Sequence, residues 1–131
     1  MKSRRVLLVD DSQVFLKAAE RFLLHGVPGF ELAGKATSGE QAITMVAALR
    51  PDLVLMDLAM PGMNGLEATR RIKQQHDAPK VLIVTLHDES TYRVLAKDAG
   101  ADGFLLKENF VTELPGLVTS LFETTAWAGS K

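Results

Sequence analysis

Two short apolar runs that each end in aspartate constrain the fold of this chain more than any other feature. Residues 6–9 are followed by Asp10 and Asp11, and residues 53–56 are followed by Asp57. A continuous apolar run of this length, bounded by charge, is typical of a buried strand in a parallel sheet. The carboxyl ends of such strands form one functional edge, where the three carboxylates are expected to meet. They favour a divalent cation between them, because like charges this close do not all stay ionised otherwise.

Three further apolar runs alternate with segments of helical periodicity. Together with the first two runs they predict five strands and five helices in strict alternation. Right-handed crossovers make such a sheet parallel, with helices on both of its faces. At 131 residues the chain is long enough for one such domain. The further runs are residues 81–84, 104–106 and, more weakly, 30–36, and helical spacing is seen at 15–23, at 42–49 and, more weakly, at 66–72.

Capping residues predict where several helices begin. Two pairs have the spacing of a capping box: Ser38 with Gln41, and Asn64 with Glu67. We also expect Asp88 and Thr112 to cap the last two helices, which would place Pro115 in a first helical turn. Gly26 and Gly100 each follow a helical run and are expected to end it.

Composition excludes several classes of function. The hydrophobic share of 47% and the charged share of 24% are ordinary for a globular domain. A net charge of -1 provides no basic field for nucleic acid or for an acidic membrane surface. The chain contains no cysteine, which fits a cytoplasmic location, and no apolar segment is long enough to span a bilayer.

Residues at the ends of the predicted strands form a set that resembles the receiver domain of bacterial two-component response regulators. The matching stretches are Val-Asp-Asp-Ser at 9–12, Met-Asp-Leu-Ala-Met-Pro-Gly-Met-Asn-Gly at 56–65, Val-Thr at 84–85 and Gly-Ala-Asp-Gly-Phe-Leu-Leu-Lys at 100–107. The resemblance covers residues 1–122 and is greatest to receivers fused to DNA-binding domains of the LuxR/NarL type. It implies a flavodoxin-like (βα)5 sandwich with a five-stranded parallel sheet in the order 2-1-3-4-5. Residues 123–131 are expected to be a helix end or the start of a linker.

The resemblance also implies a role for each matching acid and for the lysine. Asp57 would accept a phosphoryl group from a sensor histidine kinase or from a small phosphodonor. Asp11 and Asp57 would bind Mg²⁺ directly, the backbone carbonyl of Ala59 would add a ligand, and Asp10 would act mainly through water. Lys107 would supply a positive charge to the phosphoryl oxygens.

Thr85 and Phe104 are expected to carry the signal away from the acceptor. By the resemblance, Thr85 moves toward the phosphoryl group and Phe104 rotates into the space that it leaves. The fourth helix, fifth strand and fifth helix then present a changed surface, which would control transcription through another domain or would form a homodimer. Because Phe104 lacks a hydroxyl, no hydrogen bond from its ring can hold it inward. Ala59 and His87 flank the entrance and are expected to tune hydrolysis.

Other functions and simpler roles stay open at the level of sequence. A stand-alone receiver would act only through protein contacts, whereas a flavin- or nucleotide-binding protein would need a phosphate cradle where Asp10 and Asp11 stand. A phosphatase with an aspartyl nucleophile would need a second acid in place of Ala59. Taken singly, the Asp10–Asp11 pair is explained by a helix cap and first-turn acid, Thr85 by a strand hydroxyl whose hydrogen bonds are satisfied, and Lys107 by a solvated charge. Neither a helix-turn-helix pattern nor a basic patch is recognisable in the sequence.

Overall fold

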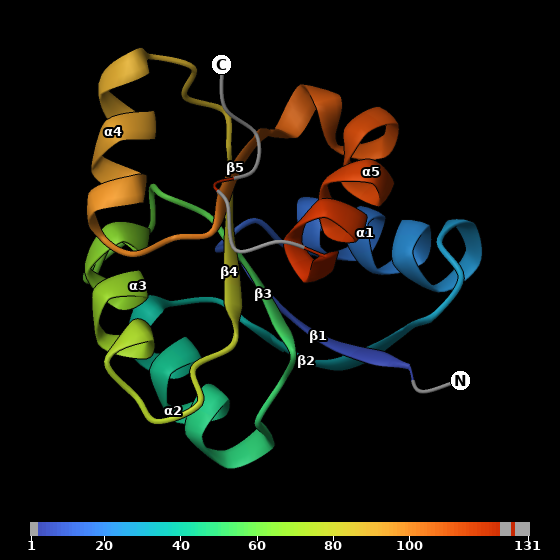
Figure 1. The fold of residues 1–131 in the computed structure, drawn as a ribbon, viewed down its shortest axis with the longest axis horizontal. Coiled ribbons are helices and arrows are strands. Elements are labelled where there is room, and N and C mark those ends of the chain that lie inside the picture. Colours follow the sequence, from blue (N-terminus) through green and yellow to red (C-terminus); the bar gives the residue numbers. More distant parts are fainter. Residues whose placement is uncertain (1–2, 124–126, 128–131) are drawn as a thin grey trace.

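The computed structural model describes residues 3–123 and 127, and it has the predicted alternation of strands and helices. All strands are parallel and follow the predicted order β2-β1-β3-β4-β5 (Figure 1). The strands are β1 (Arg4–Val9), β2 (Phe30–Ala36), β3 (Leu53–Met56), β4 (Lys80–Thr85) and β5 (Gly103–Leu106). The helices are α1 (Gln13–Gly26), α2 (Gly39–Leu49), α3 (Gly65–Lys73), α4 (Ser90–Asp98) and α5 (Phe110–Glu123), with a 3₁₀ turn, η1 (Lys107–Asn109), directly before α5.

Helices cover both faces of the sheet, and the sheet separates the hydrophobic core into two clusters (Figure 1). Helices α1 and α5 lie on one face, and α2, α3 and α4 lie on the other. Successive strand residues point to opposite faces, so Leu8 packs with the first pair of helices and Leu7 with the other three. Phe104 belongs to the core beneath α2, α3 and α4, whereas its neighbour Leu105 belongs to the opposite one.

The two predicted capping boxes are each half formed. Ser38 caps α2 through Oγ, which accepts a hydrogen bond from the Gln41 amide at 3.1 Å. The Gln41 side chain does not complete the box, because its oxygen accepts from the amide of Thr37 at 2.7 Å. The prediction of a helix start is therefore confirmed, while the return bond reaches one residue further back.

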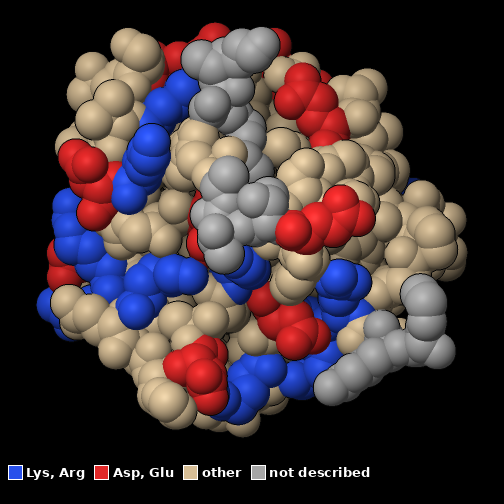
Figure 2. Space-filling model, viewed as in Figure 1, with Lys and Arg blue, Asp and Glu red and all other residues tan. Residues whose placement is uncertain are grey.

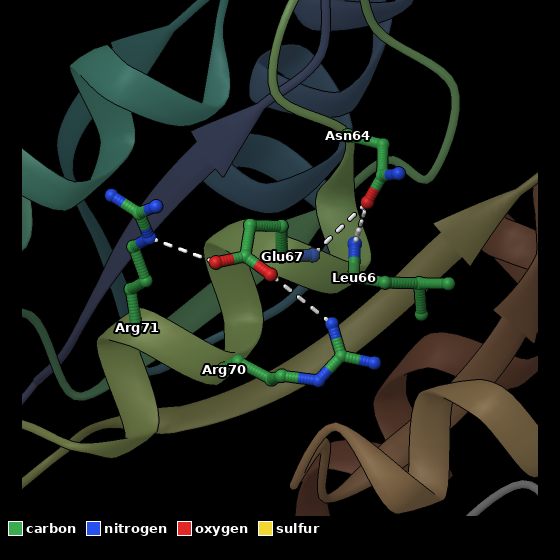
Figure 3. A network of polar contacts seen from close by, with 5 residues as sticks. All are labelled: Asn64, Leu66, Glu67, Arg70 and Arg71. Atoms are coloured by element: carbon green, nitrogen blue, oxygen red, sulfur yellow. Dashed lines mark hydrogen bonds and ion pairs between the residues drawn. The ribbon is translucent and has the colours of Figure 1, made fainter.

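Asn64 caps α3, but Glu67 has other partners (Figure 3). The Asn64 side-chain oxygen accepts from the amides of Leu66 and Glu67 at 2.9 and 3.0 Å. The Glu67 carboxylate instead accepts from Arg70 at 3.2 Å and from Arg71 at 2.9 Å. Pairs of this spacing lie one turn apart on a helix, so they compete with the return bond of a capping box.

The expected caps of the last two helices are wrong. Helix α4 begins at Ser90, and its N-cap residue is Glu89, which makes no side-chain cap hydrogen bond. Asp88 lies one residue before the cap position and pairs with Arg93 at 3.3 Å. Helix α5 begins at Phe110 as a continuation of η1, so Thr112 lies inside it, and Pro115 lies inside the helix rather than in its first turn.

Helix α5 reaches Glu123, and the remainder of the expected tail, apart from Trp127, lies outside the described residues. Gly100 has a φ of 98° just after α4, as expected for a residue that ends a helix. None of the helices in the described ranges combines the length and apolarity that a membrane crossing needs. On the face shown in Figure 2, acidic side chains lie among the basic ones.

Gly65, at the start of α3, permits the loop after β3 to close against Asp57. Its amide donates to the Leu58 carbonyl at 2.9 Å, and a Cβ at this position would lie 2.0 Å from the Asp57 carbonyl oxygen. Backbone cannot yield as a flexible side chain would. Gly116, in α5, is the opposite case, because a Cβ there would meet nothing within 4 Å.

We therefore expect opposite effects from two glycine-to-alanine changes. Gly65→Ala should lower the free energy of unfolding by about 3 kcal/mol, since the new methyl group displaces backbone. Gly116→Ala should raise it by roughly 0.5–1 kcal/mol, because alanine loses less conformational entropy in a helix. Urea unfolding of both variants measures this, and a Gly65→Ala protein as stable as the wild type would contradict the described loop.

Candidate functional site

The carboxyl ends of four strands bring the predicted residues together. Parallel pairing aligns Val9 of β1 with Met56 of β3, and the Asp57 amide donates to the Val9 carbonyl at 3.0 Å. Asp10 and Asp57 therefore leave adjacent strands at the same level. A cavity of about 250 Å³ opens at this edge. It is lined by Asp10, Asp11, Ser12, Asp57, Ala59, Thr85, Leu86, His87 and Lys107.

Three carboxylates converge in this cavity. One oxygen from each of Asp10, Asp11 and Asp57 lies within 4.8 Å of the other two, with Asp10 and Asp57 buried and Asp11 exposed. Asp10 also accepts a hydrogen bond from the Ser12 amide at 2.9 Å. Ser12, which has no role in the sequence prediction, caps α1 by accepting from the Phe15 amide, so the acid pair is not the helix cap. Capping of α1 therefore does not use the carboxylates of the acid pair.

Lys107 is held inside the cavity and is not a solvated charge. Its side chain is 13% exposed, and Nζ lies 2.7 Å from Asp10 Oδ2 and 3.9 Å from Asp57 Oδ1. Nζ also lies 4.6 Å from the centre of the Phe15 ring, within the range of a cation–π contact. The ammonium group therefore offsets part of the negative charge that the aspartates bring to this edge.

Asp57 is the titratable group that its surroundings perturb most clearly. Burial raises the pKa of its carboxyl group to about 7 from 3.8, and repulsion from Asp10 adds to the effect. The Lys107 ammonium group and a hydrogen bond from the Leu58 amide lower the pKa but only partly compensate. Any cation that binds between the carboxylates would favour the ionised form further.

Thr85 and His87 lie on the fourth strand end and on the loop after it. Thr85 is fully buried, and its Oγ accepts from the His87 amide at 3.2 Å, so the hydroxyl is tied to its own loop. The His87 ring lies 5.2 Å from the Tyr92 ring of α4. This loop therefore connects the cavity to α4.

Phe104 is the predicted site residue that does not line the cavity. It is 1% exposed in the core beneath α4, and the Arg93 guanidinium lies 4.5 Å from the ring centre. The Phe104 ring is therefore buried, with the positively charged guanidinium group of Arg93 against it. Nothing in the sequence pattern relates Arg93 to Phe104, because the two residues come from different elements.

Comparisons with known proteins agree with this geometry. Residues 6–119 match the family described as the response regulator receiver domain. The chain is 38% identical over 104 residues to the transcriptional regulatory protein DegU of Brevibacillus brevis, which covers 79% of this chain and 44% of that protein. It is 36% identical over 118 residues to the response regulator GacA of Pseudomonas viridiflava, which covers 90% of this chain and 55% of that protein.

A solved structure shows the same relationship. A LuxR-family two-component response regulator from Aurantimonas sp. SI85-9A1 superposes with a TM-score of 0.87 at 33% identity, covering 97% of this chain and 91% of that one. The chain spans about half the length of the curated relatives that it matches. Because the family match covers most of the chain and includes all four strand ends of the site, this chain belongs to the receiver domains of two-component response regulators.

Proposed function

We propose that this receiver is switched by transfer of a phosphoryl group from a sensor histidine kinase to Asp57. The observation that supports this most is the placement of the Asp57 carboxylate, which is buried beside two further acids and 3.9 Å from the Lys107 ammonium group. An aspartate with an acid pair on one side and a lysine on the other can hold both a cation and a phosphoryl group.

The residues of the cavity have distinct parts in the transfer. An Asp57 oxygen attacks phosphorus, and the bond from phosphorus to the donor breaks on the opposite side, so that the acyl phosphate forms in line. Only the carboxylate form of Asp57 is a good nucleophile, and Lys107 favours that form by attraction. Lys107 then pairs with a phosphoryl oxygen, and the Thr85 hydroxyl donates to another.

The acid set also fits Mg²⁺, which prefers oxygen ligands and is commonly held by one or two carboxylates. Asp11 and Asp57 would bind the ion directly, with the Ala59 carbonyl as a third protein ligand. Asp10 would act through water, which agrees with its direct pairing to Lys107 at 2.7 Å. When bound, the ion neutralises charge on the attacking and transferring oxygens.

Residues around the entrance would set the lifetime of the acyl phosphate. Ala59 and His87 both line the cavity. The small side chain of Ala59 would admit the hydrolytic water, and His87, supported by its contact with Tyr92, would orient it.

The output is proposed to leave through the face formed by α4, β5 and α5. Residues 1–122 would form the receiver, and residues 123–131 would be a helix end or the start of a linker. Through this face the receiver would control transcription by way of an effector domain. The same face would serve a homodimer or a separate effector protein. This receiver would act in the cytoplasm, where histidine kinases present their phosphoryl groups, and would not itself bind DNA or membrane.

Acetyl phosphate with Mg²⁺ should add one phosphoryl group to the protein. Asp57→Asn should abolish the addition, because an amide oxygen is not a competent nucleophile. Asp77→Asn is the matched control, since Asp77 is exposed and its φ of 53° is one that asparagine tolerates. Intact-mass measurement decides the matter, and full modification of the Asp57→Asn protein would place the acceptor elsewhere.

Mg²⁺ titration should move amide NMR signals near Asp11, Asp57 and Ala59. Asp10→Asn should weaken binding about ten-fold, as expected for a residue that acts through water. Asp11→Asn should weaken it more, because a direct ligand is lost. Signals that stay unchanged in the wild-type protein at millimolar Mg²⁺ would refute the assigned site.

In metal-free protein, Asp57→Asn should stabilise the fold increasingly as pH rises. The unfolded carboxyl ionises near 3.8 and the folded one near 7, so between these values the folded state holds a proton that the unfolded state has lost. Wild-type stability therefore falls through this window relative to the variant, and the difference levels off above about pH 7. Urea unfolding with EDTA at about pH 5 and about pH 8 measures it. A difference that is equal at both pH values would show that Asp57 is not perturbed.

A further inference from the structure

The buried position of Phe104 raises the question of what holds the ring there. Phe104 is 1% exposed and pairs through β5 with Ile83 of β4, so its backbone is fixed by the sheet. Its ring has no polar atom and therefore no directional bond of its own. Besides the apolar packing of the core, a charged neighbour can stabilise one ring position through the aromatic face.

Arg93 provides such a contact. Its guanidinium group lies 4.5 Å from the centre of the Phe104 ring, well within the distance at which a cation is attracted to an aromatic face. Arg93 comes from the first half of α4, and only 26% of its side chain is exposed. The group therefore covers the ring from the solvent side while keeping access to water for its charge.

Asp88 holds the Arg93 guanidinium group through a hydrogen bond. Nη2 of Arg93 donates to Asp88 Oδ1 at 3.3 Å. Asp88 follows His87, whose amide donates to the Thr85 hydroxyl. One short loop, residues 85–88, thus carries both the hydroxyl that faces the phosphoacceptor cavity and the carboxylate that orients Arg93.

We propose that Arg93 is the positioning residue that keeps Phe104 in its buried place, with Asp88 as the link to the phosphoacceptor site. The cation–π contact stabilises the buried ring, as a hydrogen bond from a ring hydroxyl would. Movement of Thr85 toward a phosphoryl oxygen shifts the 85–88 loop and so changes how Asp88 holds Arg93. Arg93 then transmits the change to β5 and α4 together.

This coupling rests on the proposed function, but the contact of Arg93 with the Phe104 ring, here called the clamp, is a property of the free protein. By the proposed function, phosphoryl binding favours the buried position of the Phe104 ring. A contact that increases the fraction of molecules with a buried ring then also increases the affinity for a phosphoryl group, because apparent affinity scales with the fraction of molecules that can bind. Loss of this partly buried cation–π contact should then reduce the affinity about two- to five-fold. An ordinary surface ion pair would have no such effect on a distant ligand.

The first experiment measures the exposure of the ring in the free protein. In protein made with 4-fluorophenylalanine, the Phe104 signal is assigned by its loss in Phe104→Leu, and its shift between H₂O and D₂O reports contact with solvent. Arg93→Met should increase that shift, and Asp88→Asn should increase it by a smaller amount. Arg71→Met is the matched control, because Arg71 is also a helix arginine paired with an acid, here Glu67 at 2.9 Å. Among the described residues, no aromatic ring lies against its guanidinium group.

The second experiment measures binding of beryllium fluoride, a phosphoryl mimic, in the presence of Mg²⁺. Arg93→Met should weaken binding about two- to five-fold, and Arg71→Met should leave it unchanged. In a Phe104→Leu background, Arg93→Met should have no further effect, because the ring on which it acts is absent.

Each result separates the clamp from the proposed function. An unchanged solvent shift in Arg93→Met, or an equal loss of affinity with and without Phe104, would overturn the role of Arg93. Failure of the wild-type protein to bind beryllium fluoride would instead refute the phosphoacceptor proposal, while the fluorine measurement would still decide whether Arg93 holds the ring.

Discussion

The ion pair between Lys107 and Asp10 is the interaction on which the site depends. Parallel pairing of β1 with β3 places Asp10 and Asp57 side by side at the carboxyl edge of the sheet, where both are buried. Two buried carboxylates repel each other, and a positive charge close to them offsets this repulsion. The Lys107 ammonium group, 2.7 Å from Asp10, provides that charge from the end of β5. The edge can therefore form as a charged pocket before any ligand arrives.

Burial also makes Asp57 responsive to what enters the pocket. Because desolvation raises its pKa to about 7, small changes in nearby charge decide whether it is ionised. Asp11, the exposed acid of the set, is the one placed to meet an incoming cation first. The reactivity of Asp57 is thus set by the balance between its own burial, the acid pair and Lys107.

Two aromatic contacts connect the pocket to opposite helical layers. Lys107 lies over the Phe15 ring, which packs edge-on against Phe110 with ring centres 5.4 Å apart, and so reaches α1 and α5. The loop that begins at Thr85 reaches α4 on the other face through Arg93, which covers Phe104. A change of charge at one strand end can therefore alter the packing of helices on both faces of the sheet.

The strand pattern was predictable because it depends on local properties of the chain. Unbroken apolar runs form buried strands wherever they occur, and an aspartate directly after such a run must lie at the edge of the sheet. Helix starts were predictable at Ser38 and Asn64 for the same reason. They were not at Asp88 and Thr112, since Asp88 pairs with Arg93 and η1 runs directly into α5. Capping by a side chain competes with its other partners, and those are settled by the fold.

By itself, the sequence determined the order of the elements, the parallel sheet and the meeting of Asp10, Asp11 and Asp57 with Lys107 at one edge. These features follow from hydrophobic burial and strand direction, which act along short stretches of chain. Only the tertiary structure decided that the Asp57 pKa is raised, that Lys107 pairs first with Asp10 and that Arg93 covers a buried Phe104. Each of these depends on desolvation and on distances between groups far apart in the chain, for which one-dimensional spacing carries no information.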